Sequence, residues 1–280
     1  MRPMLDECMR GFLRRSWCFF VLYIALLGSL LLMLVSQLRN NDLVSLDPIE
    51  SPNAPKALVL AKTRDENVSW TDSIRWKPYI YTVDNEDGFI PVPANKGREG
   101  MAYLTHIIDN YDNLADITAF MHASAKQWHN DIGDTTTSNL LSRLRPQAIK
   151  DKGYSNLRCD HRPGCPIAVR PFDEEYTSKH NIVYKDFATF YADLFRIPIE
   201  QVPREVGGVC CGQFAVSRER IRQRSREEYI QMREWALTSS LHNFAIGSVL
   251  EMVWHVIFME DYVSCPDTQQ CYCDLYDLCH

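Results

Sequence analysis

The segment Asn95–Asn130 reads NKGREGMAYLTHIIDNYDNLADITAFMHASAKQWHN, and the rest of the chain is interpreted from it. Apolar residues recur at helical spacing between Met101 and Tyr111. A short apolar run of the strand type follows from Ile117 to Met121. The segment therefore predicts a helix that leads into a buried strand.

Polar side chains stand at both ends of this helix–strand unit. Ligands of open α/β sheets lie outside the carboxyl ends of the strands, near helix N-termini that favour negative charge. We therefore expect a ligand site here; the alternative is that the histidines are only hydrogen-bonded structural residues. Asn95, Gly97, Arg98 and Glu99 lie before the helix. His122 and His129 lie after the strand and are the candidate ligands of a metal or a phosphate.

Other short apolar runs complete the expected sheet. Strands are predicted at 57–61, 79–83 and 214–216, and helices at 137–143, 187–195, 227–238 and 247–259. Lys62 and Arg64 follow the first strand, so they form a second group that could face a ligand. The pattern predicts one α/β domain with a mixed, mostly parallel sheet flanked by helices.

The N-terminal region has the composition of a membrane anchor. Residues 17–38 contain no charged side chain and are long enough to span a bilayer, and Arg10, Arg14 and Arg15 precede them. We predict a cytosolic tail at 1–16, a transmembrane signal anchor at 17–38, a stem at 39–56 and a luminal domain at 57–280. The rival interpretation is a cleaved signal peptide, whose apolar core is usually shorter.

Charge and cysteine content narrow the class of protein. A formal charge of -6 over 280 residues offers no basic face for nucleic acid, and the run of arginines between Arg218 and Arg226 is either a solvated helix face or an anion site. Eight of the ten cysteines lie beyond the predicted span and indicate disulfides in a luminal domain, with a zinc site as the alternative. Asn67 begins an N-glycosylation sequon, Asn-Val-Ser.

The cysteine spacing suggests partners without determining them. Cys159 and Cys165 bracket a Pro-Gly turn and could close a small loop. Four cysteines crowd the last sixteen residues, where apolar content is low, and one of them could bond Cys210 or Cys211. We expect these bonds to hold the C-terminus in place.

Two further groups could carry chemistry. Glu251 and His255 are four residues apart on a predicted helix, so they are either a base with its orienting partner or a salt-linked helix face. The acidic loop that contains Asp84 and Asp87 is either a divalent-cation site or an ordinary turn.

Several motifs together resemble one protein family. NKGREGMAYLTHIIDNYDNL, FMHASAKQWHN, CCGQFAVSRERIR, LEMVWHVIF and CPDTQQCYCDLYDLC look like a fungal family known as domain of unknown function 3431, in order from about Ala57 to Cys279. A weaker resemblance is to glycosyltransferases of the rhamnan-synthesis type. They carry an Asn-x-Gly-Arg-Asp motif, a helix and a strand that ends in a His-centred motif. Glu99 replaces the aspartate here.

This second resemblance implies a GT-A type fold and a nucleotide-sugar donor. It implies that Glu251 is the base, with His255 beside it, and that the donor-binding residues are Lys62, Arg64, Asn95, Gly97, Arg98, Glu99 and Gln213. The Asp-x-Asp motif with which such enzymes commonly hold Mn or Mg is absent from FMHAS, so the resemblance leaves a divalent cation as an open cofactor.

Three hypotheses follow. The first is a type II membrane protein of the Golgi or endoplasmic reticulum that transfers sugar from a nucleotide-sugar to a glycan or protein acceptor. The second is a non-catalytic luminal or cell-surface module that binds glycans or a partner protein. The third is a metal-dependent hydrolase built on His122, His129 and His255.

Overall fold

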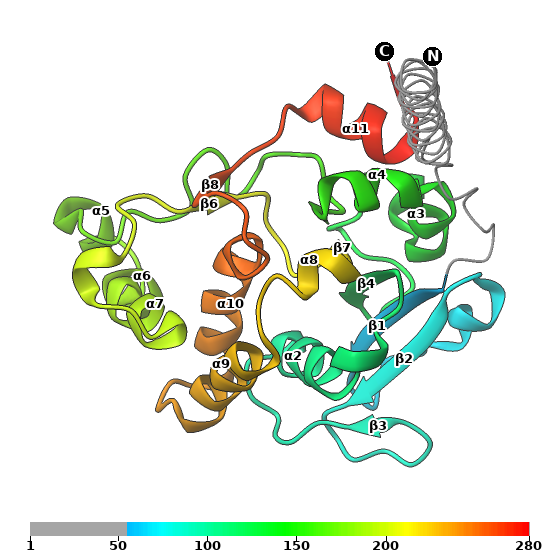
Figure 1. Ribbon diagram of the computed structural model, residues 1–280, viewed down its shortest axis with the longest axis horizontal. Helices are drawn as coiled ribbons and strands as arrows, with labels where there is room; N and C mark the ends of the chain where they lie inside the picture. Colours follow the sequence, from blue (N-terminus) through cyan, green and yellow to red (C-terminus); the bar gives the residue numbers. More distant parts are fainter. Residues whose placement is uncertain (1–54, 280) are drawn as a thin grey trace, which may run out of the picture. The chain divides into compact units, whose positions relative to one another are not determined.

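The computed structural model describes residues 55–279, which lie in a compact unit spanning Ala54–His280. Its centre is a six-stranded sheet with the strand order β3-β2-β1-β4-β7-β5. The strands are β1 (Lys56–Lys62), β2 (Lys77–Thr82), β3 (Ile90–Pro91), β4 (Ile117–His122), β5 (Tyr154–Asn156) and β7 (Phe214–Ser217). Figure 1 shows this sheet between two groups of helices.

The sheet is mixed and mostly parallel, as predicted. β1 pairs in parallel with β2 and with β4, and β2 pairs in parallel with β3. β7 runs antiparallel to both β4 and β5. The chain therefore builds outward from β1 to β3 in one direction and continues on the other side of β1 with β4, so the order reverses between β1 and β4 (Figure 1).

Each face of the sheet is covered by its own group of helices. One face packs against α2 (Glu99–Asp109), α7 (Phe187–Phe195), α9 (Arg226–Thr238) and α10 (Asn243–Ile257), with Phe120, Phe214 and Trp254 in the core between them. The other face packs against α3 (Thr137–Arg143), α4 (Pro146–Lys152) and α11 (Thr268–Tyr276). Burial on both faces explains why β1 and β4 are continuous apolar runs.

The helix ends follow local capping chemistry. Ser217 caps α8 (Arg218–Ile221) by accepting from the Arg220 backbone N–H. Ser225 and Glu228 form a capping box that starts α9. α10 starts four residues before the predicted Gly247, because the His242 side chain accepts from the Ala245 backbone N–H.

Short elements without a clear period were not predicted. They include α4, α11 and β5, together with α5 (Glu174–Ser178), α6 (Ile182–Lys185) and a two-stranded parallel sheet of β6 (Gly207–Gly208) and β8 (Val263–Ser264). Short 3-10 helices occur at η1 (Ser69–Ser73), η2 (Tyr111–Asn113), η3 (Gly133–Thr135) and η4 (Ile199–Gln201).

Four disulfides hold this part of the chain, and they correct the pairings suggested by spacing. Cys159 bonds Cys271 and Cys165 bonds Cys265, so the small loop between Cys159 and Cys165 is not closed. Cys210 and Cys211 bond each other rather than the C-terminal cysteines, and Cys273 bonds Cys279. The tail is nevertheless cross-linked to the domain, as expected.

The predicted tail, membrane anchor and most of the stem lie outside the described residues. Within residues 55–279, no helix combines the length and apolar content that a bilayer span requires. Asn67 is exposed, and its side-chain oxygen accepts from the Ser69 backbone N–H at 2.8 Å.

Candidate functional site

The first cavity of interest lies where the strand order reverses. It has a volume of about 500 Å³ and is called the switch cavity here. Side chains at the carboxyl ends of β1, β2 and β4 meet there with the N-terminal region of α2 and the first residue of α10. Its lining residues are Ala61, Lys62, Thr63, Glu66, Val83, Asn95, Arg98, Glu99, His122 and Asn243. Such reversal points are where open α/β sheets bind their ligands.

Arg98 brings an uncommitted positive charge to the switch cavity. Its backbone N–H donates to the Asn243 side-chain oxygen at 2.8 Å, and the Asn243 amide donates to Asn95 at 3.0 Å, so α2 and α10 are joined at the cavity wall. The Arg98 guanidinium lies over the Phe244 ring at 5.0 Å. No ion pair to this guanidinium occurs within residues 55–279.

The glycines of the Gly97–Gly100 turn serve helix packing. A Cβ added to Gly97 would lie 3.0 Å from Ile246, and one added to Gly100 would lie 2.5 Å from Leu250. Both neighbours belong to α10. Gly97 is not among the residues that line the switch cavity. Its small size lets α10 approach α2, which gives this glycine a structural reason independent of any ligand.

The basic residues at the end of β1 and just beyond it, Lys62 and Arg64, are largely engaged by the protein itself. Lys62 is 2% exposed, forms an ion pair with Glu86, and lies 4.4 Å from the centre of the Phe89 ring. The Arg64 backbone N–H donates to the Asp84 carboxylate at 2.7 Å, and its guanidinium does not line the cavity. The acidic loop after β2 is thus used to hold the segment after β1. No group of three or more potential ligands in residues 55–279 has the arrangement of a metal site.

His122 and His129 lie together at the exit of β4, with ring centres 4.7 Å apart. Burial lowers the pKa of each to about 4, so both imidazoles are neutral at pH 7. His122 Nε2 and His129 Nδ1 are buried without a hydrogen-bond partner in the described part of the chain. Of these two histidines, only His122 lines the switch cavity. The His129 ring packs against the rings of His122 and Trp128.

Two half-buried glutamates lie near this cavity on different helices. Glu99, in the first turn of α2, lines the switch cavity, and burial raises its pKa. Burial, and secondarily the charge of Glu99, raises the pKa of Glu251 to about 7. The backbone N–H of Cys211 and the charge of Arg98 oppose that rise. A carboxyl group with a pKa near neutrality can exchange protons at physiological pH.

Glu251 faces a second cavity of about 390 Å³, called the Glu251 cavity here. Tyr176, Tyr184, Cys210 and His255 also line it. The structure therefore unites Arg98 and His122 in one cavity, places Glu251 in another, and leaves Arg64 outside both. The two cavities are neighbours, because Gly100, which follows Glu99, packs against Leu250, which precedes Glu251.

His255 does not act on Glu251 in the way that the spacing suggested. Its Nε2 donates to the Tyr262 carbonyl at 3.1 Å, and burial lowers its pKa. No hydrogen bond or ion pair joins it to Glu251 among the described residues. The two side chains share a helix face and a cavity without the salt link or the base–orienter contact that were expected.

Gln213 is placed away from the proposed donor site. It is fully buried, and its amide donates to the Asn130 side-chain oxygen at 2.8 Å. It does not line the switch cavity. A donor-binding role for Gln213 therefore has no geometric support.

The arginine run proves to be structural. Arg222 and Arg226 donate to carbonyls at the C-terminal end of α2 and beyond it, and Arg224 donates to the Ile257 carbonyl at the end of α10. Cationic side chains at helix C-termini satisfy free carbonyls and favour the dipole. Neither interpretation of the run as a solvated face or an anion site describes these contacts.

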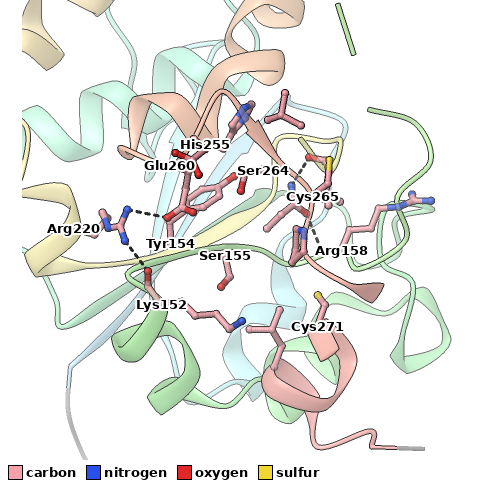
Figure 2. A pocket seen from close by; sticks show the side chains of 16 residues that line it. Lys152, Tyr154, Ser155, Arg158, Arg220, His255, Glu260, Ser264, Cys265 and Cys271 are labelled. Carbon is pink, nitrogen blue, oxygen red and sulfur yellow. Dashed lines mark hydrogen bonds and ion pairs between the residues drawn. The ribbon is translucent and has the colours of Figure 1, made fainter. Parts of the chain in front are cut away.

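A third cavity, of about 450 Å³, lies between β5 and α11 (Figure 2). Its charged groups are largely paired with the protein. Arg220 donates to Glu260 at 2.8 Å and to the Lys152 carbonyl at 2.8 Å, as the dashed lines in Figure 2 show, while the Lys152 ammonium pairs with Asp274 at 2.8 Å. These contacts fasten the end of α10 and the C-terminal helix to the sheet edge.

Sequence reasoning missed several residues of the two cavities. Glu66 accepts from the Thr63 backbone N–H at 2.8 Å and from the Ser124 hydroxyl at 3.2 Å, and so joins the exits of β1 and β4. Asn243 and the Cys210–Cys211 disulfide were missed as well. The signal for Glu66 was its place four residues after a buried strand; the adjacent cysteines were visible but were assigned other partners.

Comparison with known proteins gives a family and no function. No curated protein and no solved structure matches the chain. One family model, described as a protein of unknown function, matches residues 58–274 and so covers most of the chain, including every residue of both cavities. The chain therefore belongs to the DUF3431 family.

Proposed function

We propose that this protein is a glycosyltransferase that binds a nucleotide-sugar in the switch cavity and uses Glu251 to deprotonate an acceptor hydroxyl. The observation that carries the proposal is the position of Arg98 in the switch cavity, at the reversal point of the sheet, with Glu251 in the neighbouring Glu251 cavity. Transfer from a nucleotide-sugar needs a cation at the donor diphosphate and a base at the acceptor hydroxyl.

The donor side depends on Arg98 and on α2. The Arg98 guanidinium, which forms no ion pair among the described residues, and the N-terminus of an eleven-residue helix both favour a diphosphate. Glu99 opposes this in its charged form, but its raised pKa shifts it towards the neutral form. Asn95 and Asn243, which are hydrogen-bonded to each other, offer amide groups to the sugar or the ribose.

The acceptor side depends on Glu251. Its carboxylate takes the proton of the acceptor hydroxyl, the acceptor oxygen forms the new bond to the anomeric carbon, and the bond from that carbon to the diphosphate oxygen breaks. The charge that develops on the leaving diphosphate is stabilised by Arg98. Because the described residues form no cluster suited to a divalent cation, no step is assigned to Mn or Mg.

A second candidate function is a non-catalytic module that binds glycans or a partner protein. Glu66 and Glu99 line the switch cavity, and Lys62 is neutralised by Glu86, so the cavity carries less positive charge than its basic residues suggest. This charge balance is better suited to a neutral ligand than to a diphosphate.

The proposed setting is the lumen of the Golgi or the endoplasmic reticulum, with residues 17–38 as a type II anchor. Four disulfides support an oxidising compartment. The exposed position of Asn67 is compatible with glycosylation there.

Donor binding is tested by the thermal stability of the full-length protein with a panel of nucleotide-sugars, with and without manganese. A donor at about 100 times its Kd should stabilise the native state by about 2.7 kcal/mol. Arg98→Ala should lose the response, while Arg64→Ala should keep it, because Arg64 lies outside the cavity. A panel without any response, or an equal response in both variants, would favour the binding module.

A further inference from the structure

The Glu251 cavity contains polar groups that the protein leaves without partners. Ser248, Glu251 and His255 line it from α10, and Tyr184 lines it from α6. Within residues 55–279 no side chain hydrogen-bonds to the Glu251 carboxyl group, and neither the Ser248 nor the Tyr184 hydroxyl has a hydrogen-bond partner. These groups are therefore available to a ligand in the cavity.

His255 adds an acceptor nitrogen to this set. Its Nε2 lies 3.1 Å from the Tyr262 carbonyl, and because a carbonyl oxygen only accepts, this nitrogen carries the proton. Burial lowers the pKa of His255, so the ring is neutral at pH 7 and Nδ1 keeps a lone pair. A Cβ added to Gly208 would lie 2.8 Å from Nδ1, and Gly208 lines the Glu251 cavity but not the third cavity. Nδ1 is therefore on the side of the Glu251 cavity.

The two acceptors define what a ligand must offer. Glu251 and His255 are four residues apart on α10, a spacing that places Cβ atoms about 5–6 Å from each other. An ionised Glu251 and the His255 Nδ1 both accept, so a fitting ligand carries two donors within a short span. The Ser248 and Tyr184 hydroxyls can donate to the oxygen atoms of the same ligand. A serine or threonine of a polypeptide has one hydroxyl and satisfies only one of the two acceptors.

The rest of the cavity wall suits the apolar face of a sugar ring. Tyr176, Tyr184, Ile167 and Met252 line it. The Tyr176 hydroxyl donates to the Ala168 carbonyl at 2.8 Å, which holds this ring in place. Aromatic and apolar walls with a few polar groups are typical of small-molecule sites, and a volume of about 390 Å³ is near the lower end of their range. The size suits a terminal sugar rather than a length of polypeptide.

The charge of the cavity favours a neutral sugar. No lysine or arginine among residues 55–279 lines it, and Glu251 is its one carboxyl group in that part of the chain. An anionic ligand would therefore meet no counter-charge here, in contrast to the switch cavity with Arg98. The two neighbouring cavities thus differ in the charge of the ligand that each can hold.

We propose that the Glu251 cavity binds a neutral sugar through two hydroxyl groups, one of which donates to Glu251 and the other to His255 Nδ1. His255 is then a binding residue whose tautomer selects a polyhydroxylated ligand. The inference rests on the proposed function where it makes the hydroxyl at Glu251 the acceptor of transfer, and it identifies that acceptor as a glycan rather than a protein. Binding of the sugar itself does not depend on a donor.

Saturation-transfer difference NMR on the full-length protein tests the binding. The probes are the methyl pyranosides of glucose, galactose and mannose, with methyl glucuronide, N-acetylserinamide and butylammonium for comparison. At least one neutral hexoside should bind, and the three comparison compounds should not. Preferred binding of the glucuronide, the serine amide or the ammonium ion would overturn the inference, as would the absence of binding by every hexoside.

Two substitutions separate recognition by His255 from a purely structural role. In His255→Gln the amide nitrogen is as many bonds from Cβ as Nε2 is, so the bond to Tyr262 can form, but the acceptor at Nδ1 is lost; hexoside binding should weaken about tenfold. His255→Asn places an oxygen as many bonds from Cβ as Nδ1 is and gives up the bond to Tyr262, so it should weaken binding less. A structural role predicts the opposite order and overturns the inference.

His161→Gln is the matched control. The His161 Nε2 also bonds a backbone carbonyl, that of Pro266 at 2.6 Å, but this residue does not line the Glu251 cavity. Hexoside binding should be unchanged in this variant. An effect equal to that of His255→Gln would show that the loss is not specific to the cavity and would overturn the role of Nδ1.

Monodeoxy analogues of the bound hexoside test the same point on the native protein, where folding of a variant is not in question. Removal of either of two hydroxyls should weaken binding about tenfold, and removal of the others should change it little. Dependence on fewer than two hydroxyls overturns the inference. Hexoside binding without any nucleotide-sugar binding would overturn the proposed function and keep the inference. Nucleotide-sugar binding with transfer to a serine peptide, and no hexoside bound, would do the reverse.

Discussion

Glu251 keeps its proton to a pH at which an exposed glutamate is ionised. Its pKa rises from 4.5 to about 7 on folding, so the native state binds the proton more tightly than the unfolded state does. The contribution to stability is therefore fully present below pH 4.5 and is lost as the pH rises to about 7. Above pH 7 the folded protein carries the cost of an incompletely solvated charge at Glu251.

Glu251→Gln should consequently be more stable than the wild type at pH 8 and similar to it at pH 4. The gain at pH 8 should be as much as about 3 kcal/mol, since one pKa unit corresponds to 1.36 kcal/mol. Denaturant unfolding at the two pH values measures it. Glu234→Gln, an exposed site on α9, is the matched control and should change stability at neither pH. Equal effects of the two variants would contradict the buried, proton-holding state of Glu251.

The same substitution bears on catalysis. Transfer by the wild type should increase as the pH rises through 7, because the base must be ionised. Glu251→Gln should reduce turnover by about 10² to 10⁴ and remove this pH dependence, while nucleotide-sugar binding stays intact. Initial rates across the pH range, with donor binding measured in parallel, check this. Full activity in the variant would remove Glu251 as the base.

Part of the site could be predicted because the sequence shows which residues stand at strand ends and helix starts. In this fold, those residues meet at one edge of the sheet. Arg98 and His122 meet in the switch cavity for this reason. The direction of a side chain beyond a strand end is decided by contacts that spacing does not contain. Arg64 turns to Asp84, and Gln213 is buried against Asn130.

At the scale of elements, the contact between α2 and α10 positions the site. Gly100 has no space for a Cβ, which would lie 2.5 Å from the Leu250 Cδ1 atom. This close approach brings Arg98 and Asn243 to one wall, where they are hydrogen-bonded. The crossing of the two helices is therefore a requirement for the cavity as well as for the core.

Gly100→Ala should destabilise the protein by about 1 to 3 kcal/mol through overpacking. Leu250→Ala should itself be destabilising, but it opens space, so the added cost of Gly100→Ala should largely vanish in the double variant. Chemical unfolding of the single and double variants gives this coupling. Strictly additive effects would mean that the two residues are not in contact.

Helices and strands with a clear hydrophobic periodicity or apolar run were predictable. Those that depend on tertiary contacts were not. The helices at 137–143 and 187–195 were placed with the bounds that α3 and α7 have. β5 is three residues, Tyr-Ser-Asn, too short for any alternation, and it exists because β7 pairs with it. α11 has little apolar content of its own and depends on the Cys159–Cys271 bond and on packing against α4.

At the scale of the whole molecule, two long-range disulfides connect the C-terminal region to the segment that follows β5. Cys159 and Cys271 are 112 residues apart, Cys165 and Cys265 are 100 apart, and Cys273 and Cys279 are only 6 apart. A cross-link that closes a longer loop removes more entropy from the unfolded chain.

Serine substitution of both long-range pairs should therefore cost about 7 to 8 kcal/mol, because the two nested bonds together close one loop of about a hundred residues and a second of about a dozen, whereas removal of the Cys273–Cys279 bond should cost about 2 kcal/mol. Equilibrium unfolding in guanidinium chloride compares the two variants directly. Similar losses for both would indicate that native-state packing, rather than loop length, determines what these bonds contribute.

The two long cross-links also constrain the biosynthesis of the protein. Cys159 and Cys165 leave the ribosome a hundred or more residues before their partners, so their thiols must wait until residues 265 and 271 have been synthesised. A polypeptide that ends before residue 265 would contain Cys159 and Cys165 without their disulfide partners. We expect quality-control machinery to recognise its two unpaired thiols. Maturation of this domain is thus tied to synthesis of its final residues.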